Sequence, residues 1–399
     1  MNKKNIVIYA IVFFVIFAIE FGLNSYLSFT IDKEQYLFYQ NLMNVLPLFT
    51  TLLGFGTPFA VVYLTSLSKY NNKVYLLESN LFTLYFSLFL FSFCVILYNL
   101  EYLELYILIA LILGFFNAIK QNSVNFYLAK KELNKSSVIR LNQKLIYLMV
   151  IVVSIYFLTI NNDKTVSMIL VTGEILGLLV LTFKYRIFLF SKFKKIKSIL
   201  NISKYAFLSN LFSMISLATP IVLLNYFEYS SAEIISFSIA YSLLKYSGIL
   251  LAPFMQLITL YFTPIKNDFE KVKILYKKYA ILLFAFGIII SFVMFFLSEF
   301  IINTFFSQEY NNAVDIFNVL IFSLPFLFVN SFSMSLISSV ISVKITSIIV
   351  LFTMLMMIIG NYFIHFFYLN IYWLSIFIVV YNLAIMFISS YNLLKERCN

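Results

Sequence analysis

A lysine lies in the middle of a strongly apolar stretch, "ISFSIAYSLLKYSGILLAPF" (235–254). If this stretch is helical, Lys245 is about 18 Å from Glu233 and about 30 Å from Lys266 along the helix, at 1.5 Å per residue. A lysine side chain does not easily reach either membrane surface from that depth, and a charge there costs about 3 kcal/mol. We therefore expect Lys245 to face water, a partner or a substrate.

Polar and small residues recur around Lys245 at steps of three or four and define one helix face. This face consists of Ser238, Tyr241, Lys245, Gly248, Ala252, Gln256, Thr259 and Thr263. A second polar face, interrupted by proline and glycine, consists of Gln40, Asn44, Pro47, Thr51, Gly54 and Pro58. Both faces predict a hydrated cavity inside a bundle of helices.

The candidate cavity residues are those whose groups suit phosphate or sugar binding: Lys245, Lys120, Tyr241, Ser238, Gln256, Asn44, Gln40 and Asn117. Glu20 and Glu174 are candidates for proton or cation coupling, and no other cofactor is expected. Two alternatives stay open. Small and polar residues also hold membrane helices together, and Lys245 can form a structural ion pair with Glu20 or Glu174.

The composition indicates an integral membrane protein. Of the 399 residues, 62% are hydrophobic and only 11% are charged, whereas soluble domains carry about 25% charged residues. A span needs about 20 apolar residues. Twelve stretches qualify: 6–31, 36–66, 77–98, 103–128, 145–160, 166–188, 204–228, 232–262, 277–298, 312–338, 345–368 and 371–394. The first is longer than a signal-peptide core, so we expect a retained helix.

Lysine and arginine predict the orientation. With both termini in the cytoplasm, all but four of the 28 Lys and Arg residues lie at the cytoplasmic face. Lys33 and Lys164 lie outside, and Lys120 and Lys245 lie within the membrane. The basic linker 184–198 is expected to contact anionic lipid. The net charge of +11 therefore needs no nucleic-acid partner.

A weak internal repeat predicts two lobes of six helices. At an offset of 198–199 residues, 73–77 (KVYLL) matches 271–275 (KVKIL), and Gly54-Phe55 matches Pro253-Phe254. An even number of helices per repeat makes the two halves parallel. We expect lobes at 1–198 and 199–399, with the substrate between them.

Several functions are excluded by what the sequence lacks. It has no G-x-x-x-x-G-K-[ST] motif, so the chain does not hydrolyse ATP by that route. Its two cysteines, Cys94 and Cys398, lie far apart and form no disulfide framework or metal cluster. His365, within an apolar run, is expected to be a packed side chain. No metal site and no enzymatic activity are predicted.

Three segments of the second half resemble the polysaccharide flippases of the multidrug/oligosaccharidyl-lipid/polysaccharide exporter superfamily. They are "SKYAFLSNLFSMISLATP" (203–220), "SAEIISFSIAYSLLKYSGILLAPF" (231–254) and "IINTFFSQEYNNAVDIFNVLIFSLPF" (301–326). In the third, Phe306, Tyr310 and Ala313 fit the family signature Phe-Gly-x-x-Tyr-x-x-Ala, with Ser307 in place of glycine.

The resemblance implies an all-α, V-shaped, two-lobed transporter in the bacterial cytoplasmic (inner) membrane. It would move undecaprenyl-diphosphate-linked oligosaccharide repeat units to the outer leaflet for O-antigen or capsule synthesis. Its partners would be membrane lipids, this lipid-linked oligosaccharide and other membrane proteins of polysaccharide assembly. Lysine suits the diphosphate, and polar helix faces suit sugar hydroxyls.

Four other functions compete with this interpretation. A multidrug or small-molecule antiporter of the same superfamily would use Glu20, whereas Lys120 and Lys245 favour an anionic substrate. Lipid II flippases usually carry two further helices. A polymerase or ligase would need a larger extracytoplasmic loop with catalytic Arg or His. A scaffold would leave the buried charges unexplained.

The orientation is testable by cysteine accessibility in intact cells. A cysteine replacing Lys195 should resist an impermeant thiol reagent, because the linker is cytoplasmic, and one replacing Asn312 should react. The opposite labelling would reverse the orientation.

Overall fold

The computed structural model is helical throughout the part of the chain that it describes, which is residues 3–67, 73–101, 104–157, 163–185, 193–249, 262, 268–367 and 370–395. It divides into two compact units, Met1–Met214 and Ile215–Asn399. The predicted fold class, an all-α integral membrane protein built as two helix bundles, is confirmed. The predicted lobe boundary at 198/199 lies near the start of α8, and these lobe limits stay a prediction.

Unit 1 is built around one central helix. Its helices are α1 (Lys3–Thr30), α2 (Lys33–Gly54), α3 (Thr57–Leu67), α4 (Val74–Asn99), α5 (Leu105–Ala129), α6 (Leu133–Phe157), α7 (Asp163–Tyr185) and the first part of α8 (Ile196–Tyr226). The central helix, α5, packs against α2, α3, α4, α6 and α7. About half of its residues are buried, which places Lys120 inside the bundle.

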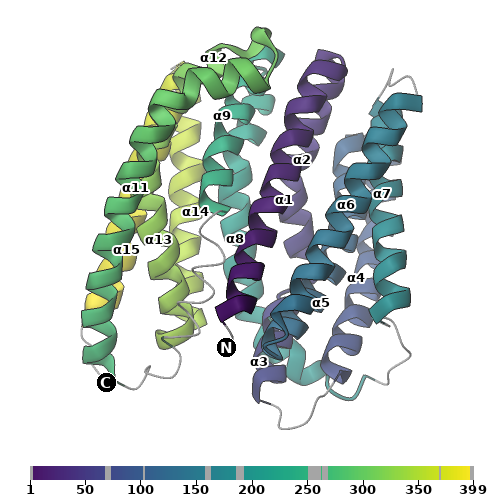
Figure 1. Ribbon diagram of the computed structural model, residues 1–399, viewed down its shortest axis with the longest axis vertical. Helices are drawn as coiled ribbons and strands as arrows, with labels where there is room; N and C mark the ends of the chain where they lie inside the picture. Colours follow the sequence, from purple (N-terminus) through teal and green to yellow (C-terminus); the bar gives the residue numbers. More distant parts are fainter. Residues whose placement is uncertain are drawn as a thin grey trace. The chain divides into compact units, whose positions relative to one another are not determined.

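Unit 2 has a similar arrangement, but its central helix is divided into two shorter helices. It contains the rest of α8, α9 (Ser231–Ile249), α11 (Phe269–Phe305), α12 (Asn312–Leu320), α13 (Leu324–Leu336), α14 (Val343–Phe366) and α15 (Ile371–Leu394). A 3₁₀ turn, η3 (Ile321–Ser323), joins α12 to α13, and a π-helical turn, η4 (Ile337–Ile341), follows α13. Figure 1 shows α11 extending along its whole unit.

The helix contacts of the two units correspond. In unit 1, α5 packs on α2, α4 and α7, and α6 packs on α7. In unit 2, α12 packs on α9, α13 packs on α11 and α15, and α14 packs on α15. Helix α4 of unit 1 therefore takes the place of α11 in unit 2, as the sequence offset suggests.

Each of the twelve predicted spans overlaps a helix of the described residues. Within those residues, eight helices are long and apolar enough to cross a membrane, or nine if the bent pair α2–α3 counts as one span. The helices α6, α7 and α9 overlap three further predicted spans without meeting that criterion.

The predicted span 36–66 is not straight. It breaks between α2 and α3 with a bend of 52°. Phe55 and Gly56 have positive φ angles of 45° and 69°, so the chain leaves the helical conformation there. The Phe55 ring stacks on Phe207 of α8 with centroids 4.4 Å apart. The bend is thus packed against the beginning of α8.

A buried carboxylate holds the segment that leads into α8. Glu78 of α4 is fully buried and accepts hydrogen bonds from the backbone N–H groups of Lys194 (3.0 Å) and Lys195 (2.7 Å). These amides precede the first residue of α8, where a negative charge is favoured by the helix dipole. The predicted basic linker is therefore fixed to unit 1 at its end.

The residues that fit the family signature form a packed corner between α11 and α12. Phe306, Tyr310 and Ala313 are all buried, and the short 3₁₀ helix at Gln308–Tyr310 packs on α9. Burial raises the pKa of Tyr310 to about 12, and the nearby Glu309 adds to the rise, so its hydroxyl stays neutral. This signature therefore has a structural role in unit 2.

Gly56 should resist substitution because of its surroundings. A Cβ atom there would lie 2.3 Å from the Ser203 carbonyl oxygen and 2.8 Å from the Phe207 nitrogen. Gly56→Ala should destabilise the protein by about 1–3 kcal/mol. The control is Gly22→Ala, because nothing lies within 4 Å of a Cβ at Gly22 in α1. Thermal unfolding in detergent should show a lower Tm for the first variant alone, and equal Tm values would contradict the packed bend.

Candidate functional site

An ion pair joins α1 to α6 in unit 1. The Lys144 ammonium lies 2.8 Å from Glu20 Oε1, and the two side chains are 21% and 29% exposed. Glu20 lies well inside α1 and Lys144 near the middle of α6. The carboxylate that the sequence marks as a coupling candidate therefore has a cation as its direct neighbour.

Further charges surround this pair. Lys120 of α5 lies within electrostatic reach of Lys144, Glu174, Glu20 and Arg140. Lys144 in turn interacts with Glu174 of α7, which is only 3% exposed. We call Glu20, Lys120, Arg140, Lys144 and Glu174 the unit 1 charge cluster. It brings together four helices and contains three cations and two carboxylates.

Arg140 is held by aromatic rings. Its Cζ atom lies 4.6 Å from the centroid of Phe13 and 5.9 Å from that of Tyr9, both on α1. Contacts of a guanidinium with aromatic faces stabilise a desolvated cation by about 1–2 kcal/mol. Its Nε atom is buried without a hydrogen-bond partner among the described residues. Arg140 thus keeps an unused donor within the unit 1 charge cluster.

Arg140 and Lys144 precede the predicted span 145–160, but in the structure both lie within α6. In the structure α6 begins at Leu133, twelve residues before the predicted start of that span. In the sequence, these two charged residues interrupt the apolar run from which the span was predicted. The tertiary structure gives those charges a carboxylate and two aromatic rings as partners, so the helix continues past them.

The amides predicted to line a cavity in unit 1 have different roles. Gln40 Nε2 donates to Asn24 Oδ1 (2.7 Å), which also accepts from the Tyr36 hydroxyl (3.1 Å), and all three side chains are buried. Asn44 donates to the Gln40 carbonyl at 2.8 Å. The bond of Asn44 lies within α2, whereas the two bonds to Asn24 connect α2 to α1 and support the alternative in which polar groups join helices. Asn117 is half-buried, one turn before Lys120.

In unit 2, Lys245 lies against an aromatic ring of its own helix. Its ammonium is 4.1 Å from the ring centroid of Tyr241, one turn earlier on α9. Tyr241 is 3% exposed, and Ser238 is fully buried with a hydroxyl that has no hydrogen-bond partner among the described residues. Lys245, Tyr241 and Ser238 therefore share one face, as predicted. Gln256 lies outside the described residues.

A hydroxyl network that the sequence analysis missed extends this face. The Tyr381 hydroxyl of α15 is 2.6 Å from Ser216 Oγ of α8 and also bonds to Thr353 of α14. Tyr241 lies within electrostatic reach of Tyr381. Four helices of unit 2 thus contribute polar groups. Tyr381 carried no signal in the sequence, because a tyrosine in an apolar run is equally suited to lipid contact or packing.

The two units offer different chemistry. Unit 1 combines carboxylates and cations, so protonation of one carboxylate would leave a cation unpaired and favour a rearrangement. Unit 2 offers a lysine and neutral hydroxyls, which suit an anion or a hydroxyl-rich molecule. Among the described residues, no group of three or more His, Cys, Asp or Glu is arranged to hold a metal ion.

Comparison with known proteins finds a partial family match and several similar folds. The family model MatE matches residues 266–363. The structure of an outward-facing multidrug resistance MATE family transporter of the MOP superfamily is similar, with a TM-score of 0.75 and 14% identity over 98% of this chain and 94% of that chain. No protein of curated function matches the sequence.

Two crystal structures of a MATE protein in different conformations are also similar. The straight conformation gives a TM-score of 0.69 with 15% identity, and the bent conformation 0.66 with 14%, each over 98% of this chain. They cover 95% and 94% of those chains. At such identities the likeness shows the fold alone. The similar structures are named as multidrug resistance or MATE proteins.

Breaking the Glu20–Lys144 pair should destabilise unit 1. Lys144→Met leaves a half-buried carboxylate unpaired, and losing one partner of a buried pair costs about 3–5 kcal/mol. Because both groups keep some exposure, we expect a cost at the lower end, measured as a reduced Tm in detergent.

The double variant Glu20→Gln/Lys144→Met should recover part of that loss. Lys135→Met provides a control, because Lys135 pairs with Glu132 at an exposed position, where ion pairs contribute about 1 kcal/mol or less. Strictly additive effects of the two single changes would contradict a coupled pair.

Proposed function

We propose that this chain is a MATE-type secondary transporter that exports an amphipathic substrate across the bacterial cytoplasmic membrane, with both termini in the cytoplasm. The observation that supports this most strongly is the fold, which resembles a multidrug resistance MATE transporter over 98% of the chain. The family model matching residues 266–363 supports it independently. The charged and hydroxyl groups within the bundles supply polar surfaces along an otherwise apolar path.

Small-molecule export is the substrate class that the comparisons favour. The similar proteins are described as multidrug resistance or MATE transporters. In this proposal Glu20 and Glu174 are the coupling residues: a proton on Glu20 would release Lys144, and its loss would restore the pair. Lys120 and Arg140 would bias substrate selection toward neutral or anionic molecules by repelling cations.

Export of a lipid-linked oligosaccharide is the second candidate, and the charge balance favours it. The unit 1 charge cluster has one more cation than carboxylate, and Lys245 adds a further cation in unit 2. A diphosphate needs cationic partners, and the hydroxyls of Tyr241, Tyr381 and Ser216 can replace water around sugars. In this case the polyprenyl tail would remain in lipid, and polysaccharide-assembly proteins would be the partners.

Two transport assays in proteoliposomes distinguish the two candidate functions. One assay follows neutral, cationic and anionic fluorescent compounds under an imposed pH gradient. The other follows the transfer of a polyprenyl-diphosphate-linked sugar between leaflets. Transfer of the lipid-linked sugar alone would identify a flippase, and pH-driven movement of fluorescent compounds alone an antiporter. The absence of both activities would contradict the proposed transporter.

Lys245 should be required if the substrate is anionic. Lys245→Ala should reduce transport of an anionic substrate at least about tenfold, because one charge-assisted contact contributes about 1.5–3 kcal/mol. Lys245→Arg should retain partial activity, since it keeps the charge with a larger, planar head group. Normal transport by Lys245→Ala at normal protein abundance would exclude this role.

Glu20 should be required for proton coupling. Glu20→Gln keeps the shape of the side chain and removes its titration, so transport should lose its dependence on the imposed pH gradient. Glu309→Gln, at an exposed position between α11 and α12, is the matched control. An unchanged gradient dependence in Glu20→Gln would assign the coupling elsewhere.

A further inference from the structure

The first turns of α11 carry a concentration of lysines that the transport proposal does not use. Lys271, Lys277 and Lys278 are exposed, and Lys273 keeps 14% of its side chain exposed. Asp268 and Glu270 are the acidic residues in the same turns. We call Phe269–Lys278 the basic segment of α11.

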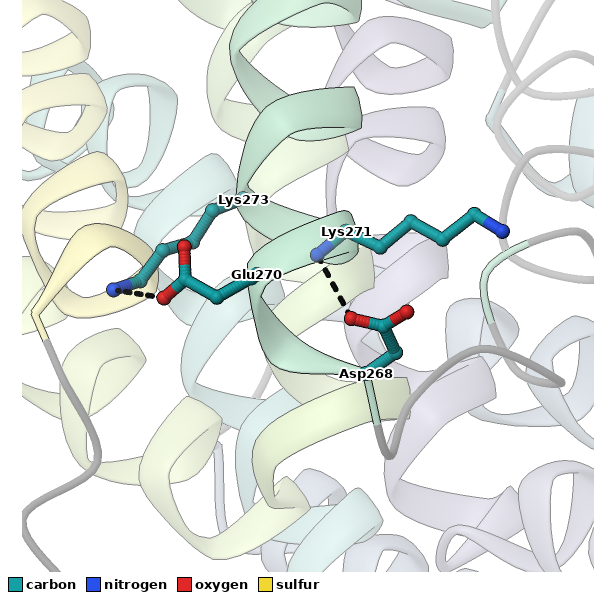
Figure 2. A network of polar contacts seen from close by, with 4 residues as sticks. All are labelled: Asp268, Glu270, Lys271 and Lys273. Atoms are coloured by element: carbon teal, nitrogen blue, oxygen red, sulfur yellow. Dashed lines mark hydrogen bonds and ion pairs between the residues drawn. The ribbon is translucent and has the colours of Figure 1, made fainter.

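The acidic residues of this region are already engaged. Asp268 accepts a hydrogen bond from the backbone N–H of Lys271 at 3.1 Å and so caps the helix. Glu270 lies 3.5 Å from the Lys273 ammonium. Figure 2 shows these two contacts, with the Lys271 side chain extending away from the helix. Within the described chain, Lys271, Lys277 and Lys278 have no ion-pair partner.

The length of α11 places this segment beside the membrane surface. The helix has 37 residues and is therefore about 55 Å long, whereas the hydrocarbon core is about 30 Å thick. No charged residue occurs between Lys278 and Glu299. Strongly exposed apolar side chains run from Ile281 (71%) through this interval to Phe300 (63%), the residue that follows Glu299. At 1.5 Å per residue these two lie about 29 Å apart, which matches the core.

The exposed face of the basic segment also has the character of an interface. Ile274 is 66% exposed, and Lys271, Lys277 and Lys278 lie three or four residues from it on the same face. Ile281 continues that face into the apolar band. An exposed isoleucine among lysines suits the headgroup layer better than bulk water. Lys277 and Lys278 lie within about 6 Å of Ile281 along the axis, which is headgroup depth.

Buried contacts hold the segment in place. Val272 and Tyr276 are buried, and the Tyr276 hydroxyl lies 2.8 Å from Ser333 Oγ of α13 and 2.7 Å from Ser390 Oγ of α15. These contacts fix the rotation of α11, so the lysines face outward together. Little ordering of the backbone is then required on binding.

We propose that the basic segment of α11 binds the headgroups of anionic phospholipids, with Lys277 and Lys278 contacting phosphate and Ile274 lying at the outer side of the headgroup layer. Each lysine near an anionic surface contributes about 1 kcal/mol of attraction. The segment thereby recruits anionic lipid to one side of unit 2 whatever the transported substrate is.

The test uses the full chain in nanodiscs, with Cys94 and Cys398 replaced by serine and a fluorophore on Ile274→Cys. Nitroxide-labelled phosphatidylglycerol or phosphatidylcholine is added at a low, equal fraction. We expect quenching by phosphatidylglycerol to be about threefold stronger, in line with one to two lysine contacts screened by salt. The variant Lys271→Gln/Lys277→Gln/Lys278→Gln should abolish this preference.

A control removes three exposed lysines of unit 1, Lys131→Gln/Lys197→Gln/Lys204→Gln, and should keep the preference at Ile274. Equal quenching by the two lipids in the parent protein would overturn the proposal, as would equal losses in both triple variants. Competition by free glycerol phosphate at millimolar concentration would also overturn it, because the segment would then bind phosphate from solution. Circular dichroism of each variant verifies that the helices are retained.

Discussion

The cost of holding charged side chains inside an apolar helix bundle is the constraint on which the rest of this structure depends. An unpaired charge in such an environment costs several kcal/mol, so each one requires a partner or access to water. Glu20 and Lys144 meet this requirement by pairing, and Arg140 by contact with aromatic rings. The packing of α1, α5, α6 and α7 in unit 1 is arranged around these contacts.

Polar contacts also determine where the helices break. Thr57, just after the bend between α2 and α3, donates to Asn122 of α5, which donates to Asn80 of α4. All three side chains are fully buried, so the freed groups at the bend find partners inside the protein rather than in lipid. The same bend packs on α8 through Phe55 and Phe207. Irregular backbone within unit 1 is thus stabilised by protein contacts.

The two units differ in chemistry, which fits a division of tasks in the proposed transporter. Unit 1 holds carboxylates beside cations, an arrangement that responds to protonation, whereas unit 2 presents Lys245 with the hydroxyls of Tyr241 and Tyr381. Because the helix contacts of the units correspond, this difference comes from side chains on a shared framework. Divergence of this kind allows one fold to serve substrates of different charge.

The sequence by itself determined the fold class, and each span that it predicts overlaps a helix of the described residues. This was possible because bilayer thickness fixes the length of an apolar run. Only the tertiary structure decided that α6 extends back to Leu133, that Glu20 pairs with Lys144 and that Tyr381 joins the polar face of unit 2. Such partners lie on helices far apart in the chain. Their distances depend on how the helices pack, which no local pattern of residues records.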